Sequence, residues 1–312
     1  MTVETVRRLT YDGFSYSCRT VMHPNPSTNP VLLVGGAFMD MCGWREMESH
    51  MTPLTSVITA DLPGQGAADR LPPSRGAEFL TASIRHMLHE IDAPRVNVVG
   101  TSYGAALAYV FAQRFPSRIN RMVLLGVAPE IPRWHRGAMK SVEAHITQGR
   151  IEDFGRYVIS IIVNRDPSCT VRNRDLVIRA LEDYYSRPNS NAHLMDVLQR
   201  ACVQKALPPG GLVGVPTLVV SGEYDHATPP REGRRVASMI GEAWFATVKE
   251  ADHAVHAERP AEVADLIMRF FQNEPLQQLA YLDTVESMSP SGFGTEGDEG
   301  HSSGERCDDD FS

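Results

Sequence analysis

Ser102 lies at the centre of a five-residue stretch, Gly100-Thr101-Ser102-Tyr103-Gly104, whose residue types and spacing suit covalent chemistry. The stretch follows an apolar run at residues 96–99 and precedes residues 105–112, which are rich in helix formers. A serine on a tight turn between a strand and a helix takes up strained backbone angles, and glycines two residues to either side let the two elements pass without a clash. Because ordinary turns also match this pattern, the serine needs identifiable partners elsewhere in the chain.

Two such partners follow later apolar runs. Asp225 lies in Gly222-Glu223-Tyr224-Asp225-His226, and His253 lies in Ala251-Asp252-His253-Ala254. An activated serine needs a base within hydrogen-bond reach, and the base needs a carboxylate that fixes its tautomer and stabilises its charged form. Because parallel strands place their sites at their carboxyl ends, we predict that Ser102, His253 and Asp225 act together as nucleophile, base and acid.

The elements that must position these residues alternate between short apolar strands and helices. Strands without polar alternation, separated by helices, indicate a parallel sheet that is covered on both faces. The expected strands span residues 11–19, which do alternate in polarity, and residues 30–34, 57–60, 96–99, 121–126, 215–222 and 243–248. The expected helices span residues 78–91, 105–115 and 260–271. We therefore predict an α/β protein with a mostly parallel, doubly wound sheet.

The alternation is interrupted between residues 129 and 208, where helical patterns and aromatic residues replace strands. We interpret residues 129–208 as a helical lid or cap, inserted between two parts of one core at residues 1–128 and 209–273. Beyond this core, a helix could continue over residues 277–285. Residues 274–312 are acidic and contain little to bury towards their end, so we expect this tail to be largely disordered.

With these residues placed, the chain from about Tyr11 to Phe271 resembles the α/β-hydrolase fold superfamily, in which serine, aspartate and histidine follow one another in this order. The stretch Asp61-Leu62-Pro63-Gly64-Gln65-Gly66 is similar to the family's strand-end turn. The stretch from Asp252 to Pro260 is similar to its histidine loop. The resemblance implies a serine hydrolase with a Ser-Asp-His triad and a helical lid.

The chain departs from the family at Gly35-Gly36-Ala37-Phe38, where many members carry a His-Gly pair. A glycine still lets this loop turn. The backbone N–H groups of Ala37 and Tyr103 are therefore the candidates for the oxyanion hole, which stabilises the negative charge that develops on the attacked carbonyl oxygen.

Other residues compete for these roles. His226 and His256 are alternative bases, although the resemblance favours His253. Asp252 and Glu223 are alternative acids. Asp252 directly precedes the base in sequence and should point away from it, so Asp225 is preferred and Glu223 is a weaker alternative.

Metal and nucleotide sites are poorly supported. His256 with Glu258, or His86 with His89, could suggest metal ligation, but structural roles explain these pairs more simply. In the turn at residues 64–66, Pro63 precedes the glycines and Asp69 stands where the third glycine of a dinucleotide motif belongs. We predict no metal and no cofactor.

Charge and composition do not point to a particular class of binding partner. The chain of 312 residues has a net charge of −8. Ten acidic residues against Arg306 give residues 274–312 a net charge of −9, so the rest carries about +1. The five scattered cysteines suggest no disulfide framework, and neither a signal-peptide core nor a membrane-spanning run is evident. We expect a cytoplasmic enzyme with a small-molecule acyl substrate and with neither nucleic acid nor membrane as partner; the oligomeric state stays open.

The predicted function is hydrolysis of an ester, thioester or lactone through an acyl group on Ser102. Phe38, Trp134 and Tyr184 are candidate substrate-binding residues. A slight resemblance to acyl-transfer members of the family, including the synthase that joins two 3-hydroxyacyl chains in rhamnolipid assembly, makes transfer to an alcohol or amine the alternative. A ligand-binding protein without catalysis is a third possibility, because one fold hosts many functions.

Overall fold

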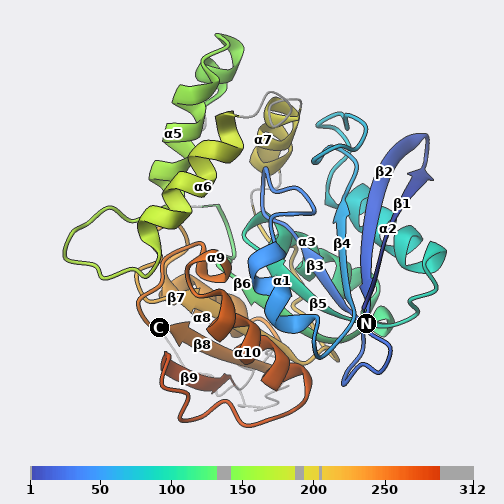
Figure 1. Ribbon diagram of the computed structural model, residues 1–312, viewed down its shortest axis with the longest axis vertical. Helices are drawn as coiled ribbons and strands as arrows, with labels where there is room; N and C mark the ends of the chain where they lie inside the picture. The colour runs from blue at the N-terminus through green and yellow to red at the C-terminus, as the bar shows by residue number, and fades with distance from the viewer. Residues whose placement is uncertain (1, 132–141, 187–192, 204–205, 289–312) are drawn as a thin grey trace, which may run out of the picture.

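A single twisted sheet crosses the whole molecule. The computed structural model describes residues 2–131, 142–186, 193–203 and 206–288. Within these residues the sheet has nine strands in the order β1-β2-β4-β3-β5-β6-β7-β8-β9 (Figure 1). The strands are β1 (Val3–Tyr11), β2 (Phe14–Met22), β3 (Val31–Val34), β4 (Val57–Asp61), β5 (Val96–Thr101), β6 (Ile119–Leu125), β7 (Thr217–Gly222), β8 (Ala243–Val248) and β9 (Leu282–Met288).

The six central strands, β4, β3, β5, β6, β7 and β8, run parallel, and the edges are antiparallel. In the register of β3 and β5, Leu32 lies opposite Val98. Both β3 and β7 are buried along their whole length, as expected for strands that are covered on two sides. The prediction of a mostly parallel, doubly wound sheet is confirmed.

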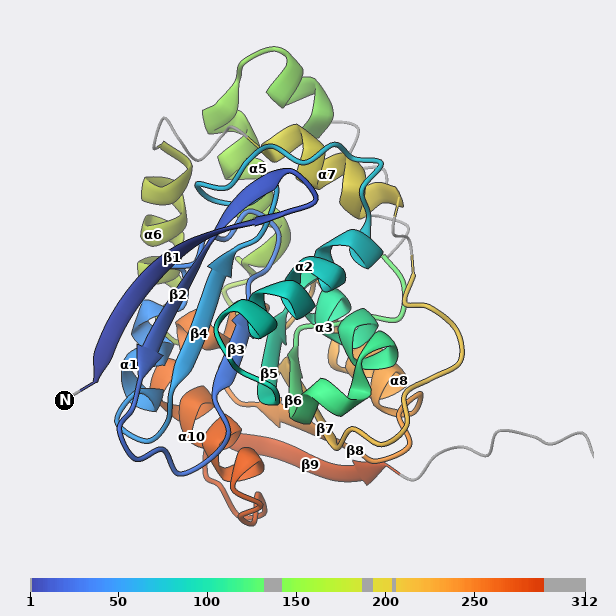
Figure 2. The ribbon, with the colours of Figure 1, turned by 90° about the vertical axis from the view of Figure 1, so that its right-hand side faces the viewer.

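Helices cover the two faces of the sheet in two layers (Figure 2). One face carries α2 (Ala77–Glu90), α3 (Tyr103–Arg114) and α8 (Pro230–Ala237), whose apolar side chains join one buried cluster. The other face carries α1 (Arg45–Met51) and α10 (Pro260–Phe271), which form a second buried cluster with the opposite side of the strands. The short helix α9 (Val255–Glu258) directly precedes α10.

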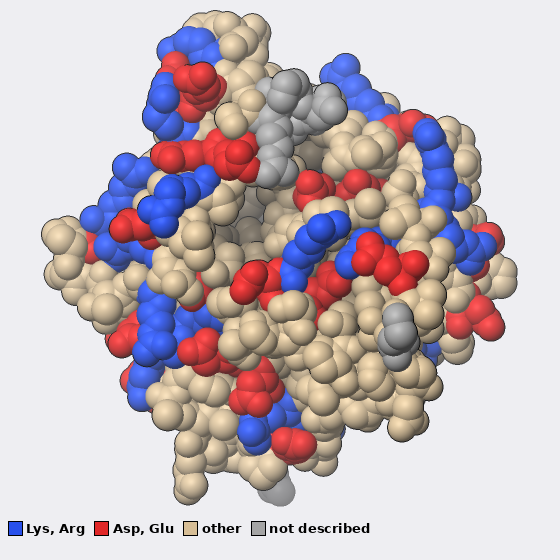
Figure 3. Space-filling view, in the orientation of Figure 1, with Lys and Arg blue, Asp and Glu red and all other residues tan. Residues whose placement is uncertain are grey.

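Three further helices, which we term the cap helices, stand above the carboxyl ends of the central strands. They are α5 (Ile151–Ile162), α6 (Arg174–Ser186) and α7 (Leu194–Val203), and most of their buried apolar side chains form a third cluster, which Ala254 of the core joins. Figure 3 shows a hollow in the surface between these helices and the sheet-bearing core. No helix in the described ranges is long and apolar enough to cross a membrane.

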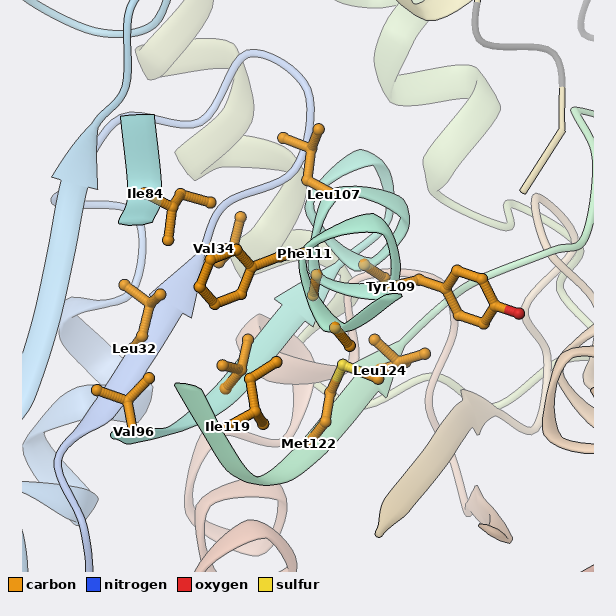
Figure 4. Close-up of a cluster of buried hydrophobic side chains, with 14 of the residues drawn as sticks. Leu32, Val34, Ile84, Val96, Leu107, Tyr109, Phe111, Ile119, Met122 and Leu124 are labelled. Atoms are coloured by element: carbon orange, nitrogen blue, oxygen red, sulfur yellow. The ribbon is translucent and has the colours of Figure 1, made fainter. Parts of the chain in front are cut away.

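Helix α3 is packed into the centre of the core. Leu107, Tyr109 and Phe111 are fully buried, and Phe111 points towards the side chains of β3 (Figure 4). Burying side chains of this size stabilises the fold by roughly 1.5–3 kcal/mol each. Because α3 begins immediately after Ser102, this packing fixes the position of the serine.

The C-terminal segment differs from the expected continuation of a helix over residues 277–285. Residues 282–288 form β9, which pairs antiparallel with β8. Val285 and Leu282 pack against the second cluster, and Arg234 holds Glu286 through hydrogen bonds of 2.8–3.1 Å. The prediction was wrong because an unpaired edge of β8 and a neighbouring arginine, both remote in sequence, favour a strand over the local helical pattern. Part of the acidic tail therefore belongs to the folded sheet.

Candidate active site

Ser102 occupies the sharp turn between β5 and α3. Its backbone angles are φ 52° and ψ −119°, outside the regions that residues other than glycine usually adopt. A Cβ at Gly100 would lie 2.5 Å from the Gly104 carbonyl oxygen, and a Cβ at Gly104 would overlap the carbonyls of Val34 and Gly35. Both glycines are therefore required because backbones approach closely there.

His253 and Asp225 lie beside this serine. The distance from Ser102 Oγ to His253 Nε2 is 3.1 Å, and His253 Nδ1 lies 3.2 and 3.1 Å from the two Asp225 carboxylate oxygens. Asp225 follows β7 and His253 follows β8, so neighbouring parallel strands deliver the two side chains to the same edge of the sheet. The structure thus brings together the three residues that the sequence singled out.

Two residues that the sequence analysis did not consider complete the surroundings of Asp225. Thr228 donates its backbone N–H and its hydroxyl to the two carboxylate oxygens, each at 2.8 Å. A Cβ at Gly126, which has φ +58°, would lie 3.0 Å from the His253 ring. A hydroxyl residue three positions after an aspartate is a recognisable turn signal, whereas nothing local to Gly126 indicates its contact with His253.

Asp225 also raises the pKa of His253. Burial by itself lowers the pKa of His253, but the charge of Asp225 and its hydrogen bond outweigh burial, so the pKa lies above the usual value for histidine. The Asp225 side chain is fully buried, and its negative charge therefore acts in a poorly screened environment. This arrangement stabilises the imidazolium that forms when His253 accepts the proton of Ser102.

The alternative bases have other partners. His256 packs against the Trp44 ring at 4.8 Å, and burial, with the neighbouring His253, lowers the pKa of His256 to about 4. His226 Nδ1 lies 3.3 Å from Asp252 Oδ1, and this hydrogen bond raises the pKa of His226. The histidine that hydrogen-bonds to Ser102 Oγ is His253.

The alternative acids are also engaged elsewhere. Asp252 accepts a hydrogen bond from the Asn164 backbone, which lies just after cap helix α5. Glu223 accepts one from the Glu250 backbone at 2.9 Å. Asp225 is therefore the acid that hydrogen-bonds to His253.

The loop expected to carry the oxyanion hole lies against the serine. A Cβ at Gly36 would be 3.5 Å from Ser102 Cβ, which places the neighbouring Ala37 beside the turn at Ser102. Neither the Ala37 N–H nor the Tyr103 N–H donates to an acceptor among the described residues. Phe38 has φ 68°, and its ring packs edge-on against Phe154 of α5 at 5.4 Å, so this loop also contacts the cap helices. Backbone strain of this kind is concentrated at functional sites.

Two of the three predicted substrate-binding residues line one pocket between the core and the cap helices. Phe38 and the turn at residues 64–66 form its core side, and Tyr184, His193, Leu194 and Val197 form its cap side. Trp134 lies outside the described residues. Gln65 and His193 were not predicted as site residues.

Comparison with known proteins assigns the family. A family model described as the alpha/beta hydrolase fold matches residues 29–260. The chain belongs to the α/β hydrolase fold family. This α/β hydrolase is 35% identical over 111 residues to 2-hydroxy-6-oxo-2,4-heptadienoate hydrolase from Pseudomonas putida. That match covers 34% of the chain and only 40% of the relative's own length.

Two longer matches cover most of the α/β hydrolase. Poly(3-hydroxyalkanoate) depolymerase from Ectopseudomonas oleovorans is 26% identical over 83% of the chain and 90% of its own length. (R)-3-hydroxydecanoyl-ACP:CoA transacylase from Pseudomonas aeruginosa is 24% identical over 85% of the chain and 89% of its own length. The relatives thus include both hydrolases and an acyl-transfer enzyme.

The fold is also found among solved structures. An α/β hydrolase enzyme from a Medee basin deep-sea metagenome library superposes with a TM-score of 0.75 at 19% identity. The superposition covers 88% of this α/β hydrolase and all of the solved chain.

Proposed function

We propose that this protein is a serine hydrolase that cleaves an ester, thioester or lactone through an acyl group held on Ser102. The observation that supports this proposal most directly is the pair of hydrogen-bond contacts of His253, with Ser102 Oγ at 3.1 Å and with the buried Asp225 carboxylate at 3.1 and 3.2 Å. Nucleophile, base and orienting acid in this geometry constitute the machinery of acyl transfer to serine.

In the proposed reaction, Ser102 Oγ attacks the carbonyl carbon while its proton passes to His253 Nε2. The N–H groups of Ala37 and Tyr103 stabilise the resulting oxyanion. His253 then gives the proton to the leaving alcohol or thiol, and the acyl group remains on Ser102. Water, activated by the same histidine, attacks this acyl group and releases the acid, which restores the serine.

The first prediction tests this mechanism with purified protein. Ser102→Ala should lower the turnover of p-nitrophenyl acyl esters by more than about 10⁴-fold and should abolish labelling by a fluorophosphonate probe, because no nucleophile remains. Ser49→Ala, which changes an exposed serine on α1, should retain both properties. Equal turnover by Ser102→Ala and the parent would exclude the serine mechanism.

Acyl transfer to an alcohol or amine is the second candidate, and the match to a transacylase over 85% of the chain favours it. The first half of the reaction is shared, and only the acceptor differs. A transferase should release little free acid until an acceptor is added, whereas a hydrolase should turn over in water alone. Product analysis by mass spectrometry with and without an alcohol or thiol acceptor separates the two.

The acyl group itself should be selected between the core and the cap helices. We propose that residues 129–208 form the lid, because Phe38 and Tyr184 line a pocket at this boundary. Two relatives that each match more than four fifths of the chain have names that refer to 3-hydroxyacyl groups. We therefore propose acyl chains with a hydroxyl at C3 as the first substrates to examine.

A further inference from the structure

The pocket between the core and the cap helices has two buried polar atoms in its walls. Gln65 Nε2 and His193 Nδ1 are both shielded from solvent, and neither has a hydrogen-bond partner within the described part of the chain. The whole Gln65 residue is only 6% exposed. A buried polar atom without a partner costs about 1–3 kcal/mol, so two of them in one pocket indicate a group that binds there.

The turn that carries Gln65 is held rigidly. Gly64 and Gly66 have φ values of +83° and +51°, and the Gln65 N–H donates to the Leu62 carbonyl at 2.8 Å. The Asp61 carboxylate accepts hydrogen bonds from the N–H groups of Met41 and Ala67, at 2.7 and 2.9 Å. The backbone that carries the Gln65 side chain is thus held in place, as the supports of binding groups that confer specificity usually are.

Asp61 also connects this turn to the candidate oxyanion loop, because Met41 belongs to the segment that follows Ala37 and Phe38. Phe38 itself lines the pocket, and Gly36 of the same loop lies against Ser102. The pocket therefore adjoins the loop that lies against Ser102.

His193 presents an acceptor to the pocket. Burial lowers the pKa of His193, so its imidazole is neutral at neutral pH and carries one N–H. A hydrogen bond between the His193 ring and the Gly66 backbone raises the pKa, against the effect of burial. If the ring N–H donates to the Gly66 carbonyl, this hydrogen bond uses the one proton of the neutral ring. Nδ1, which has no partner, is then the nitrogen with a free lone pair.

We propose that Gln65 and His193 form a subsite that recognises a hydroxyl group on the acyl chain of the substrate. The Gln65 amide donates to the hydroxyl oxygen, and the hydroxyl donates to His193 Nδ1. This inference rests on the proposed function, because it concerns the acyl group that Ser102 would carry.

A hydroxyl fits the two atoms better than other common substituents. A hydroxyl is both a donor and an acceptor, so it can hydrogen-bond to Gln65 Nε2 and to His193 Nδ1. A carboxylate has only acceptor oxygens and would face the His193 lone pair, whereas an alkyl chain would leave both atoms without a partner. The subsite thus distinguishes a hydroxyacyl chain from both an unsubstituted and an acidic one.

The test compares p-nitrophenyl 3-hydroxyhexanoate, each enantiomer separately, with p-nitrophenyl hexanoate. The preferred hydroxy ester should have a kcat/KM about tenfold or more above that of hexanoate, and Gln65→Leu and His193→Phe should each reduce this ratio towards one. Gln148→Leu, which changes an exposed glutamine among the described cap residues, is the matched control and should retain the ratio. An unchanged ratio in both site variants would overturn the subsite.

A binding measurement separates the subsite from the catalytic proposal. Methyl 3-hydroxyhexanoate and methyl hexanoate are titrated by NMR into Ser102→Ala, with and without Gln65→Leu. Tighter binding of the hydroxy ester, by about tenfold and only when Gln65 is present, supports the subsite even if the parent hydrolyses neither ester. Equal dissociation constants for the two esters would overturn it even if Ser102 proves to be the nucleophile.

Discussion

At the scale of single residues, the decisive feature is the sharing of one buried carboxylate. Asp225 contacts His253 through both oxygens while Thr228 donates to each of them. These hydrogen bonds orient the carboxylate, and the carboxylate in turn orients the imidazole towards Ser102. Since His253 must be neutral to accept a proton, its raised pKa should be visible in the pH dependence of the reaction.

Asp225→Asn should therefore lower kcat/KM by about 10⁴-fold, because the amide stabilises the wrong tautomer and no longer stabilises the imidazolium. In the parent, kcat/KM should rise with pH through an apparent pKa above 6.5, and any residual activity of the variant should rise at lower pH. Esterase assays between pH 5 and 9 measure both effects. Glu223→Gln is the control for loss of a nearby acid and should lose less than tenfold; a loss as large as that of Asp225→Asn would contradict the assignment.

At the scale of the elements, the turn from β5 to α3 depends on close contact between backbones. Gly104 packs against the carboxyl end of β3, and α3 is anchored by side chains buried on the same face of the sheet. The serine can hold its unfavourable backbone angles because these contacts stabilise the turn as a whole.

A methyl group at this contact should be poorly tolerated. Gly104→Ala would overlap the carbonyls of Val34 and Gly35, and we expect a loss of at least about 3 kcal/mol in the free energy of unfolding, with loss of activity. Gly76→Ala, at the start of α2, has open space around it and should cost no more than about 1 kcal/mol. Urea unfolding curves of both variants measure the difference; a Gly104→Ala protein as stable as Gly76→Ala would contradict this account of the turn between β5 and α3.

At the scale of the whole molecule, the cap helices and the core meet through polar contacts close to His253. Asn164, after α5, donates to Asp252, and Asn173 donates to the Glu258 carbonyl at 2.9 Å. The Glu258 side chain accepts the Asp252 N–H at 2.6 Å and is almost completely buried. Burial raises the pKa of Glu258 to about 8, so this carboxyl is protonated in the folded protein at neutral pH.

A raised carboxyl pKa makes stability fall as pH rises. Between the unfolded pKa of about 4.5 and the folded pKa of about 8, the folded state binds a proton that the unfolded state has lost. Glu258 therefore contributes a slope of up to about −1.4 kcal/mol per pH unit in this window. Glu258→Gln keeps a carbonyl that accepts the Asp252 N–H but has no proton to lose. Its free energy of unfolding, relative to that of the parent, should therefore increase as the pH rises from 5 to 8.

Urea unfolding at pH 5, 6, 7 and 8 measures this gain. Glu182→Gln, which changes an exposed side chain on α6, is the control for removal of one acid. A difference between Glu258→Gln and the parent that stays constant across the pH range would show that this carboxyl is ionised in the folded protein.

The sequence alone determined the parallel sheet and the order of the candidate nucleophile, acid and base along the chain, because apolar runs, glycine spacing and strand ends are local patterns. It also placed Ser102, Asp225 and His253 at one edge of the sheet, since parallel strands end together. The sequence also favoured Asp225 over Asp252 as the acid, but only the tertiary structure decided that Asp252 faces Asn164 and His226. It likewise decided that residues 282–288 form a strand and that Gln65 meets His193 in one pocket. Those outcomes depend on contacts between segments remote in sequence, which no local pattern encodes.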